Sequence, residues 1–198
     1  MNNINKIIDC LNNDGVLLVP TDTVYGLAIK PGSELAIDKL YQLKSRPKSV
    51  NLPIMVHSVN DIEDLGVEIT EAAKKLLSSD LIPGALTLAV GFKDVSKKDW
   101  LKGRVEVAIR IPDDQNLLSI LEKTGPLLVT SANKHGNKTP NNVIAILNDL
   151  NGKPDLVIDD GIRNETPSTL VNCRVNPPVI EREGAIPSAI IQQILNHE

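Results

Sequence analysis

The sequence predicts a single α/β domain built on a twisted, mixed β-sheet. Three observations predict this fold class. Apolar strand-like runs alternate with helix-like segments along the whole chain. A length of 198 residues suits one domain with a sizeable core. No linker or internal repeat interrupts the alternation, so we expect one unit over residues 1–198.

The predicted strands are short apolar runs. Residues 16–19 are continuously apolar, as in a strand buried on both faces. Residues 105–111 instead place apolar side chains at every second position, as in a strand with one buried face. In chain order, the predicted strands are residues 16–19, 52–57, 86–92, 105–111, 126–129, 156–158, 169–171 and 179–181.

The predicted helices carry apolar side chains three and four residues apart, which places them on one helical face. Thr70 is the expected N-cap of one helix, Pro47 closes another, and Pro187 begins the last. In chain order, the predicted helices are residues 4–13, 36–43, 71–77, 117–121, 141–150 and 187–195.

Composition argues against several classes of protein. The net charge of −4 lacks the basic footprint of a duplex binder, and 2% aromatic residues offer few platforms for base stacking. No apolar run is long enough to span a membrane, and the N-terminus lacks the apolar stretch of a signal peptide. We therefore expect a cytoplasmic protein without membrane contact.

Cysteine and histidine usage predicts no structural metal. Cys10 and Cys173 are isolated, which is typical of reduced cytoplasmic thiols. His57, His135 and His197 have no ligand spacing with each other or with cysteine.

Polar clusters follow several of the predicted strands. Thr21-Asp22-Thr23 follows residues 17–19, Thr130-Ser131-Ala132-Asn133 follows residues 127–129, and Arg110 ends the strand at 105–111. Ligands of α/β sheets bind beyond strand ends, so converging clusters would line one cavity. Taken singly, each cluster is also explained as a capped turn.

A group of cations follows the second predicted helix, in the segment Lys44-Ser45-Arg46-Pro47-Lys48. It fits a polyphosphate clamp, with arginine as a forked donor and lysine as a point charge. It equally fits a solvated helix C-terminus, where the helix dipole favours cations. The segment Gly136-Asn137-Lys138-Thr139 lacks the residue order of a P-loop, which excludes a P-loop NTPase.

The sequence contains no motif for a nucleophilic triad. Any chemistry is therefore expected to depend on positioning the reactants and stabilising charge.

Taken together, these segments resemble the YrdC-type domain of the threonylcarbamoyl-AMP synthase family, in its short, single-domain form. The motifs that carry the resemblance occur in the family's order between residues 20 and 184. They are Pro20-Thr21-Asp22-Thr23-Val24-Tyr25-Gly26-Leu27, Lys44-Ser45-Arg46-Pro47, Pro83-Gly84-x-x-Thr87, Arg110-x-Pro112, Ser131-Ala132-Asn133, Ser168-Thr169-Leu170-Val171 and Arg182-Glu183-Gly184.

The resemblance implies an α/β fold around an open, concave cavity. It implies an ATP-dependent nucleotidyltransferase that makes L-threonylcarbamoyl-AMP and diphosphate from L-threonine, bicarbonate and ATP. Mg²⁺ would come with the ATP phosphates and have no protein ligands. The product would serve threonylcarbamoyladenosine formation at position 37 of tRNA, through a separate transferase complex.

The resemblance also assigns residues. Thr23, Arg110 and Ser168 would bind threonine. Lys44 and Arg46 would act in catalysis. The residues expected to bind ATP are Lys44, Arg46, Ser131, Asn133, Thr139 and Arg182.

The sequence departs from the family pattern at two places. Met55 stands where longer synthases often carry His, and Ala85-Leu86 replaces the more usual Pro-aromatic pair. Two alternatives stay open. One is a paralogue that acts on another carbamoyl or acyl substrate. The other is an RNA-binding module, or weak RNA binding by the same domain, through Lys44, Arg46, Lys48 and Arg110.

Overall fold

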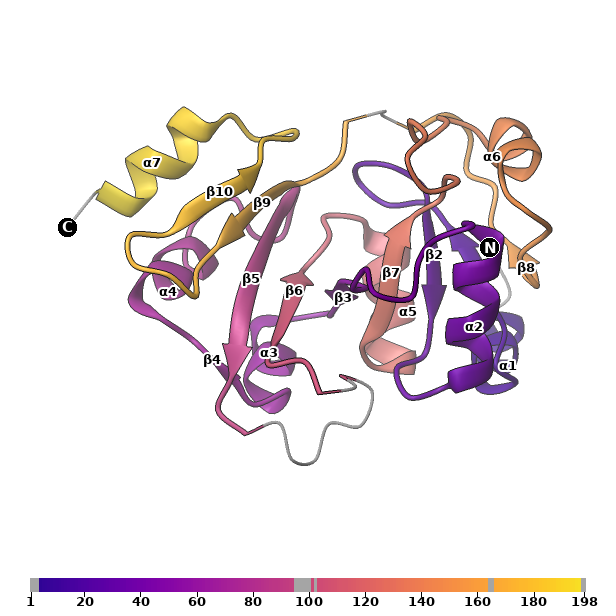
Figure 1. Cartoon of the computed structure of the whole chain (residues 1–198), viewed down its shortest axis with the longest axis horizontal. Coiled ribbons are helices and arrows are strands. Elements are labelled where there is room, and N and C mark those ends of the chain that lie inside the picture. Colours follow the sequence, from indigo (N-terminus) through magenta and orange to yellow (C-terminus); the bar gives the residue numbers. More distant parts are fainter. Residues whose placement is uncertain (1–3, 95–100, 102, 164–165, 197–198) are drawn as a thin grey trace.

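The structure is a computed structural model, and it describes residues 4–94, 101, 103–163 and 166–196. Helices and strands alternate along the chain, as Figure 1 shows. The helices are α1 (Ile4–Asn12), α2 (Glu34–Leu43), α3 (Val59–Asp64), α4 (Glu71–Leu77), α5 (Gln115–Thr124), α6 (Val143–Asp149) and α7 (Ser188–Asn196). The strands are β1 (Leu17–Val19), β2 (Gly26–Ile29), β3 (Ile54–Met55), β4 (Val67–Glu68), β5 (Leu86–Phe92), β6 (Glu106–Arg110), β7 (Leu127–Ser131), β8 (Leu156–Val157), β9 (Thr169–Asn172) and β10 (Val179–Arg182).

Within the described residues, the strands form one mixed sheet in the order β10-β9-β5-β6-β3-β7-β2-β1-β8, with β4 paired to β5. The pairs β1/β8, β3/β6 and β5/β9 are parallel, and the other pairs are antiparallel. The predicted fold class is therefore confirmed. The sheet order also places β6, β3, β7 and β2 side by side in its centre, and the polar clusters adjoin these strands.

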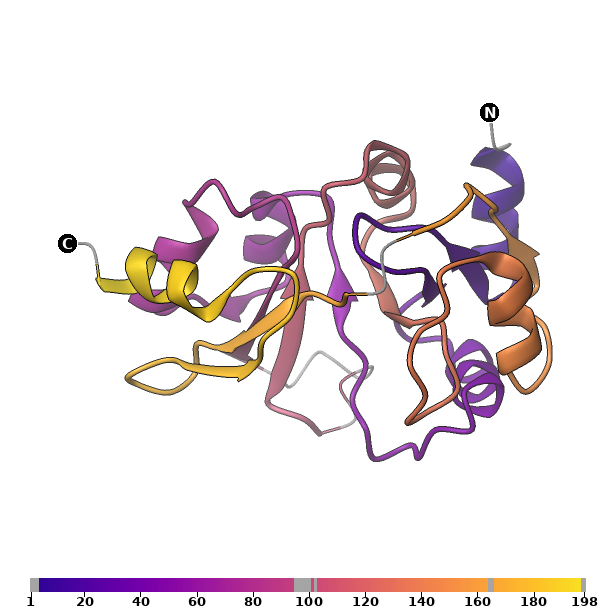
Figure 2. The same ribbon diagram turned by 90° about the horizontal axis from the view of Figure 1, so that it is seen from above.

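Strand β1 is buried on both faces. Leu17 and Val19 of β1 pack into a cluster with side chains of α1 and α5, whereas Leu18 packs into the larger core on the other face. Figure 2 shows α1 and α5 on one side of the sheet and α2 on the other. This explains why residues 16–19 are continuously apolar, since alternate side chains of a strand point to opposite faces.

The structure confirms most of the predicted elements and adds three. The Thr70 side chain accepts a hydrogen bond from Ala73 N, as expected of the N-cap of α4. Strand β2, helix α3 and strand β4 were not predicted. Helix α3 has a recognisable signal, because Ser58 and Asp61 form a reciprocal capping box. The predicted strand at 52–57 is shorter in the structure, where β3 covers Ile54–Met55.

Both cysteines are free, as predicted. Burial raises the pKa of the Cys173 thiol to about 11. Among the described residues, no helix is long and apolar enough to cross a membrane.

Candidate active site

The loop between β1 and β2 is held by its own hydroxyl groups. Thr21 Oγ1 donates to the carbonyl of Val24 at 2.6 Å and accepts from the backbone N–H of Thr23 at 3.1 Å. Both threonine side chains are buried. The Tyr25 hydroxyl donates to the carbonyl of Gly161 at 2.7 Å. Thr21 and Tyr25 therefore fix the loop, and Thr23 and Asp22 stay available for contacts with other elements.

Arg110, at the end of β6, binds this loop. Its Nη1 donates to Thr23 Oγ1 at 2.8 Å, and its Nη2 lies 2.7 and 2.8 Å from the two carboxylate oxygens of Asp22. Its Nε donates to the carbonyl of Gly84 at 2.9 Å. Burial lowers the pKa of Arg110 and the Asp22 carboxylate opposes that effect. Asp22 belonged to the predicted motif but not to the predicted site, and here it holds the arginine in place.

Ser168 and Arg182 form the next part of the site. Ser168 Oγ lies 2.7 Å from Thr87 Oγ1, and Arg182 Nη2 donates to the Ser168 carbonyl at 2.9 Å and to Ser168 Oγ at 3.2 Å. The positive charge of Arg182 also contributes to lowering the pKa of Arg110. Arg182 was assigned to the ATP side, and the structure places it beside a residue assigned to threonine.

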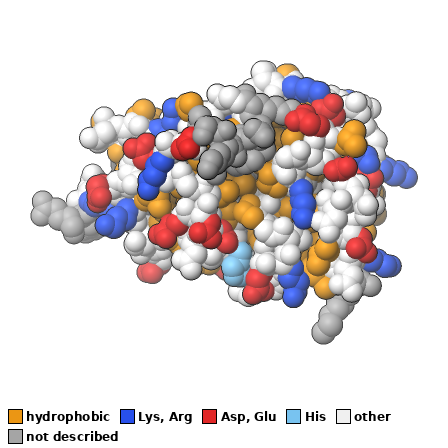
Figure 3. All heavy atoms as spheres, turned by 90° about the horizontal axis from the view of Figure 1, so that it is seen from below, with side chains coloured by type: hydrophobic (Ala, Val, Ile, Leu, Met, Phe, Trp, Pro, Cys, Tyr) orange, Lys and Arg blue, Asp and Glu red, His pale blue; other side chains and the backbone are white. Residues whose placement is uncertain are grey.

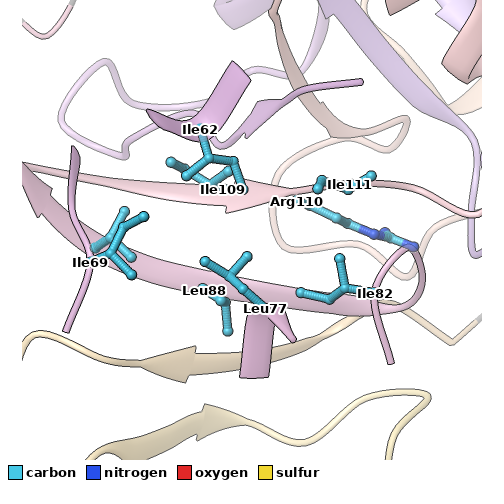
Figure 4. A pocket seen from close by; sticks show the side chains of 9 residues that line it. Ile62, Ile69, Leu77, Ile82, Leu88, Ile109, Arg110 and Ile111 are labelled. Carbon is cyan, nitrogen blue, oxygen red and sulfur yellow. The ribbon is translucent and has the colours of Figure 1, made fainter. Parts of the chain in front are cut away.

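We call Asp22, Thr23, Thr87, Arg110, Ser168 and Arg182 the Arg110 cluster. Figure 4 shows that Arg110 extends away from a group of isoleucine and leucine side chains contributed by α3, α4 and the sheet. The cavity among these side chains has a volume of about 10 Å³, enough for about one water molecule. This apolar cavity is therefore too small to hold an amino acid or a nucleotide.

Gly184 fixes the position of Ser168. A Cβ atom on Gly184 would lie 2.2 Å from the carbonyl oxygen of Pro167 and 2.6 Å from that of Ser168. We expect Gly184→Ala to lower the free energy of unfolding by about 1–3 kcal/mol, because backbone must move to admit the methyl group. Denaturant unfolding measures the effect. Gly91→Ala is the control, since its Cβ would meet nothing closer than 3.7 Å. Equal stabilities of the two variants would contradict the prediction.

Lys44 lies at the C-terminus of α2 and is 1% exposed. Its Nζ donates to the carbonyl of Ser131 and, at 2.7 Å, to that of Asn133. Its own carbonyl accepts from the His135 N–H at 2.7 Å. The ammonium group thus organises the turn after β7, and two of its three donors are already used.

Burial, and then the charge of Arg46, lower the pKa of Lys44 to about 7. Between about pH 7 and 10, the unfolded chain binds a proton on Lys44 that the folded chain lacks, so stability rises with pH. We expect Lys44→Met to reduce this slope by at most about 1.4 kcal/mol per pH unit. Urea unfolding of both proteins across the window measures the slopes. Parallel slopes would show that Lys44 keeps its ordinary pKa.

Arg46 has donors that the protein does not use. Its Nη1 donates to Thr130 Oγ1 at 3.2 Å, and its Nη2 donates to the carbonyl of Asn51 at 2.7 Å. Its Nε is buried and has no hydrogen-bond partner among the described residues. Lys48, the third cation of the segment, is exposed and pairs with Asp38 at 2.6 Å. The interpretation as a solvated helix terminus therefore fits Lys48, whereas Arg46 is partly buried.

The turn after β7 is closed by Asn133. Its Nδ2 donates to the carbonyls of Lys134 and Asn137 at 2.8 Å, and its Oδ1 accepts from Thr139 Oγ1 at 3.1 Å. Ser131 precedes this turn and is partly exposed. We call Lys44, Arg46, Thr130, Ser131, Asn133 and Thr139 the Lys44 cluster.

The loop between β1 and β2 joins the two clusters. Thr23 contacts Arg110 on one side, and on the other the Tyr25 carbonyl accepts from the Ala132 N–H at 2.8 Å. The next residue, Gly26, pairs with Ser131 in the sheet. Figure 3 shows a hollow in the face seen from below, with hydrophobic side chains at its floor and charged side chains around it. Arg110, Thr23 and Ser131 are thus linked through this loop.

Within the described part of the chain, no histidine side chain forms a hydrogen bond with either cluster. The His57 ring Nδ1 lies 3.1 Å from the carbonyl of Leu118 in α5, and Met55 is buried with side chains of that helix. Among the described residues, no group of three or more His, Cys, Asp or Glu side chains could hold a metal ion.

The fold and the site define an α/β domain that gathers arginine, lysine and hydroxyl groups around the loop between β1 and β2. The family model Sua5_yciO_yrdC, whose description reads "Telomere recombination", matches residues 9–184. The chain belongs to this family.

Relatives and a solved structure cover most of the chain. A threonylcarbamoyl-AMP synthase of Bacillus subtilis is 32% identical over 93% of this chain and 54% of its own length. A putative threonylcarbamoyl-AMP synthase of Methanocaldococcus jannaschii is 34% identical over 88% of this chain and 82% of its own. The crystal structure of Pyrococcus abyssi Sua5 complexed with L-threonine has a TM-score of 0.87 and 29% identity, covering 98% of this chain and 57% of that one. The chain therefore spans about half the length of the Bacillus and Pyrococcus proteins.

Proposed function

We propose that this chain is an L-threonylcarbamoyladenylate synthase that uses L-threonine, bicarbonate and ATP. One observation carries the proposal: the loop between β1 and β2 joins a cluster suited to an amino acid to a cluster suited to phosphates. The named synthases at 32–34% identity support it, and so does the threonine-bound Pyrococcus relative. In this proposal, Thr23, Arg110 and Ser168 bind threonine, and Arg46, Ser131, Asn133 and Thr139 bind ATP.

The reaction proceeds in two bond-forming steps. The neutral amine of threonine attacks the carbon of bicarbonate and a C–N bond forms. Water is released, and the carbamate stays bound. A carbamate oxygen then attacks the α-phosphorus of ATP, and the bond from that phosphorus to the bridging oxygen breaks. Diphosphate is the leaving group, and the proton that the threonine ammonium loses to become the neutral amine goes to solvent.

The residues of the site serve this sequence by their charge and position. Arg110 and Arg182 place positive charge where the amine must be neutral to attack, and a nearby cation favours the neutral form. Arg46 offers charge-assisted hydrogen bonds to the phosphates as negative charge moves to the diphosphate. Lys44 contributes by holding the Ser131–Asn133 turn. Mg²⁺ would arrive on the ATP phosphates, and no step is assigned to a protein-bound metal.

Product analysis tests the proposal. The protein is incubated with ATP, Mg²⁺, threonine and bicarbonate, and diphosphate and the mixed anhydride are measured. We expect diphosphate release that requires both threonine and bicarbonate. Diphosphate release in the absence of threonine or bicarbonate would overturn the proposal. So would the lack of any diphosphate release over a range of pH and ionic strength. Transfer of the product by a separate tRNA-modifying complex would be tested by adding that complex and tRNA.

The burial of Met55 supports a second candidate, a paralogue that activates another carbamoyl or acyl substrate. Met55 packs against α5 and has no imidazole. The imidazole of His57 lies against the Leu118 carbonyl and not in the Arg110 cluster. A panel of amino acids and small carboxylic acids in the same assay separates the candidates, because only the first requires threonine.

A further inference from the structure

The turn after β7 carries Ser131, Asn133 and Thr139, three of the residues proposed to bind ATP. Residues 134–138 of this turn are all exposed, and Gly136 has a φ of +86°, in the region that favours glycine. Apolar burial therefore does not fix the shape of the turn, and hydrogen bonds must do so. In Figures 1 and 2 the turn lies beside α2 and α6, the two helices whose ends supply them.

Asp149, the last residue of α6, holds one side of this turn. Its Oδ2 accepts from the backbone N–H of Lys134 at 2.5 Å, and its Oδ1 accepts from Asn137 Nδ2 at 2.6 Å. Both are charge-assisted hydrogen bonds, which are stronger than those between neutral groups. Lys44 holds the other side through the Asn133 carbonyl. Asp149 lies outside every motif considered above.

The two helices that hold the turn are themselves joined at their C-terminal ends. Asn151, two residues after α6, donates from its backbone N–H to the Leu43 carbonyl at 2.8 Å and from its Nδ2 to the Gln42 carbonyl at 3.3 Å. Lys44 follows Leu43 directly, as the C-cap of α2. Lys44 and Asp149 are therefore fixed relative to each other, and the turn is held between them.

The hold of Asp149 reaches the proposed ATP residues through Asn133. The Nδ2 of Asn133 donates to the carbonyls of Lys134 and Asn137, the same two residues that donate to Asp149. The Oδ1 of Asn133 accepts from Thr139 Oγ1. A shift of Lys134 and Asn137 would therefore change the direction of the Asn133 amide and, through it, that of the Thr139 hydroxyl.

We propose that Asp149 is a positioning residue for the nucleotide, which fixes the turn after β7 so that Asn133 and Thr139 are oriented before ATP arrives. Orientation of binding groups in advance saves the free energy of ordering them on binding. This inference rests on the proposed function for the identity of the ligand. Asp149 acts through the turn and not by touching ATP, and threonine binding by the Arg110 cluster does not depend on it.

Calorimetric titration of ATP with Mg²⁺, and separately of L-threonine, tests the inference. We expect Asp149→Asn to weaken ATP binding at least fivefold, because the amide places a donor opposite one of the two N–H groups. Threonine affinity should stay within twofold of the wild type. Asp155→Asn is the matched control, since Asp155 also accepts from a backbone N–H, that of Val16 at 2.8 Å, and from a side chain, that of Lys39. It should bind ATP as the wild type does.

An exchange of donor and acceptor separates positioning from a general loss of stability. In the double variant Asn137→Asp/Asp149→Asn, the amide at position 149 can donate to the carboxylate at position 137 while its oxygen still accepts from the Lys134 N–H. We expect ATP affinity to return to within threefold of the wild type. A double variant that binds ATP no better than Asp149→Asn would overturn the inference, and so would an Asp149→Asn variant that binds ATP as the wild type does.

Asn137→Ala gives a second test if Asp149→Asn fails to fold. It changes an exposed side chain and removes one of the two contacts of Asp149, so it should weaken ATP binding at least twofold and leave threonine binding unchanged. Unchanged ATP binding would overturn the inference. These titrations need no turnover. A wild type that binds ATP in this Asp149-dependent way but releases no diphosphate would contradict the proposed function alone.

Discussion

Replacing Arg110 with methionine is expected to lower the free energy of unfolding by about 3–5 kcal/mol, because it leaves the Asp22 carboxylate buried without its cation. The side chains of this ion pair are only 5% and 12% exposed. The change also removes the hydrogen bonds to Thr23 Oγ1 and to the Gly84 carbonyl. Since a domain is stable by about 5–15 kcal/mol, the variant should unfold at much lower urea concentrations.

The matched control is Lys48→Met. It breaks an ion pair of similar length, but its side chains are 64% and 46% exposed. Exposed pairs contribute about 0–1 kcal/mol, so this variant should unfold almost as the wild type does. The double variant Asp22→Asn/Arg110→Met removes both charges, and we expect it to regain part of the lost stability. No recovery in the double variant would show that the loss comes from packing and not from the unpaired carboxylate.

Measuring threonine affinity separates the role of Arg110, which would bind the ligand, from that of Asp22. Arg110 has one remaining Nη1 hydrogen for a ligand carboxylate, because its other contacts are to Asp22, Thr23 and Gly84. Asp22 is therefore a positioning residue that orients this guanidinium. Asp22→Glu should keep threonine affinity close to the wild-type value, whereas Asp22→Asn should lower it.

The sequence was sufficient to predict the fold class and most elements, because apolar periodicity reports burial directly. The continuous apolar run at 16–19 identified a strand buried on both faces. Strand β2 was missed because it follows the polar loop at once and begins with Gly26, a weak strand former. Strand β4 has two residues, too few to show a period.

The sequence predicted which residues belong to the candidate site. It did not predict which hydrogen bonds and ion pairs those residues form with one another. The structure joins Thr23 to Arg110, whereas Ser168 contacts Thr87 and Arg182. Which partner each side chain meets depends on tertiary contacts. Asp22 pairs with a residue 88 positions away.

The second large effect is expected at Arg46. Arg46→Ala should lower kcat/KM for threonine-dependent diphosphate release by at least about 30-fold, or about 2 kcal/mol of transition-state stabilisation. The reason is that Arg46 keeps its buried Nε free while holding Thr130 and the Asn51 carbonyl, so its fork is fixed before a ligand arrives. Stopped-flow or steady-state assays at saturating threonine separate the loss in kcat from that in KM for ATP.

Lys48→Ala is the control for this prediction, because Lys48 belongs to the same basic segment but pairs with Asp38 at the surface. It should retain wild-type kcat/KM at physiological salt, since an exposed cation is largely screened there. If Lys48→Ala lost as much activity as Arg46→Ala, the whole segment would act as a diffuse positive patch. If Arg46→Ala kept wild-type kcat/KM while folded, the phosphates would bind elsewhere. Only a loss confined to Arg46 agrees with a fixed guanidinium that gains its hydrogen bonds as the diphosphate departs.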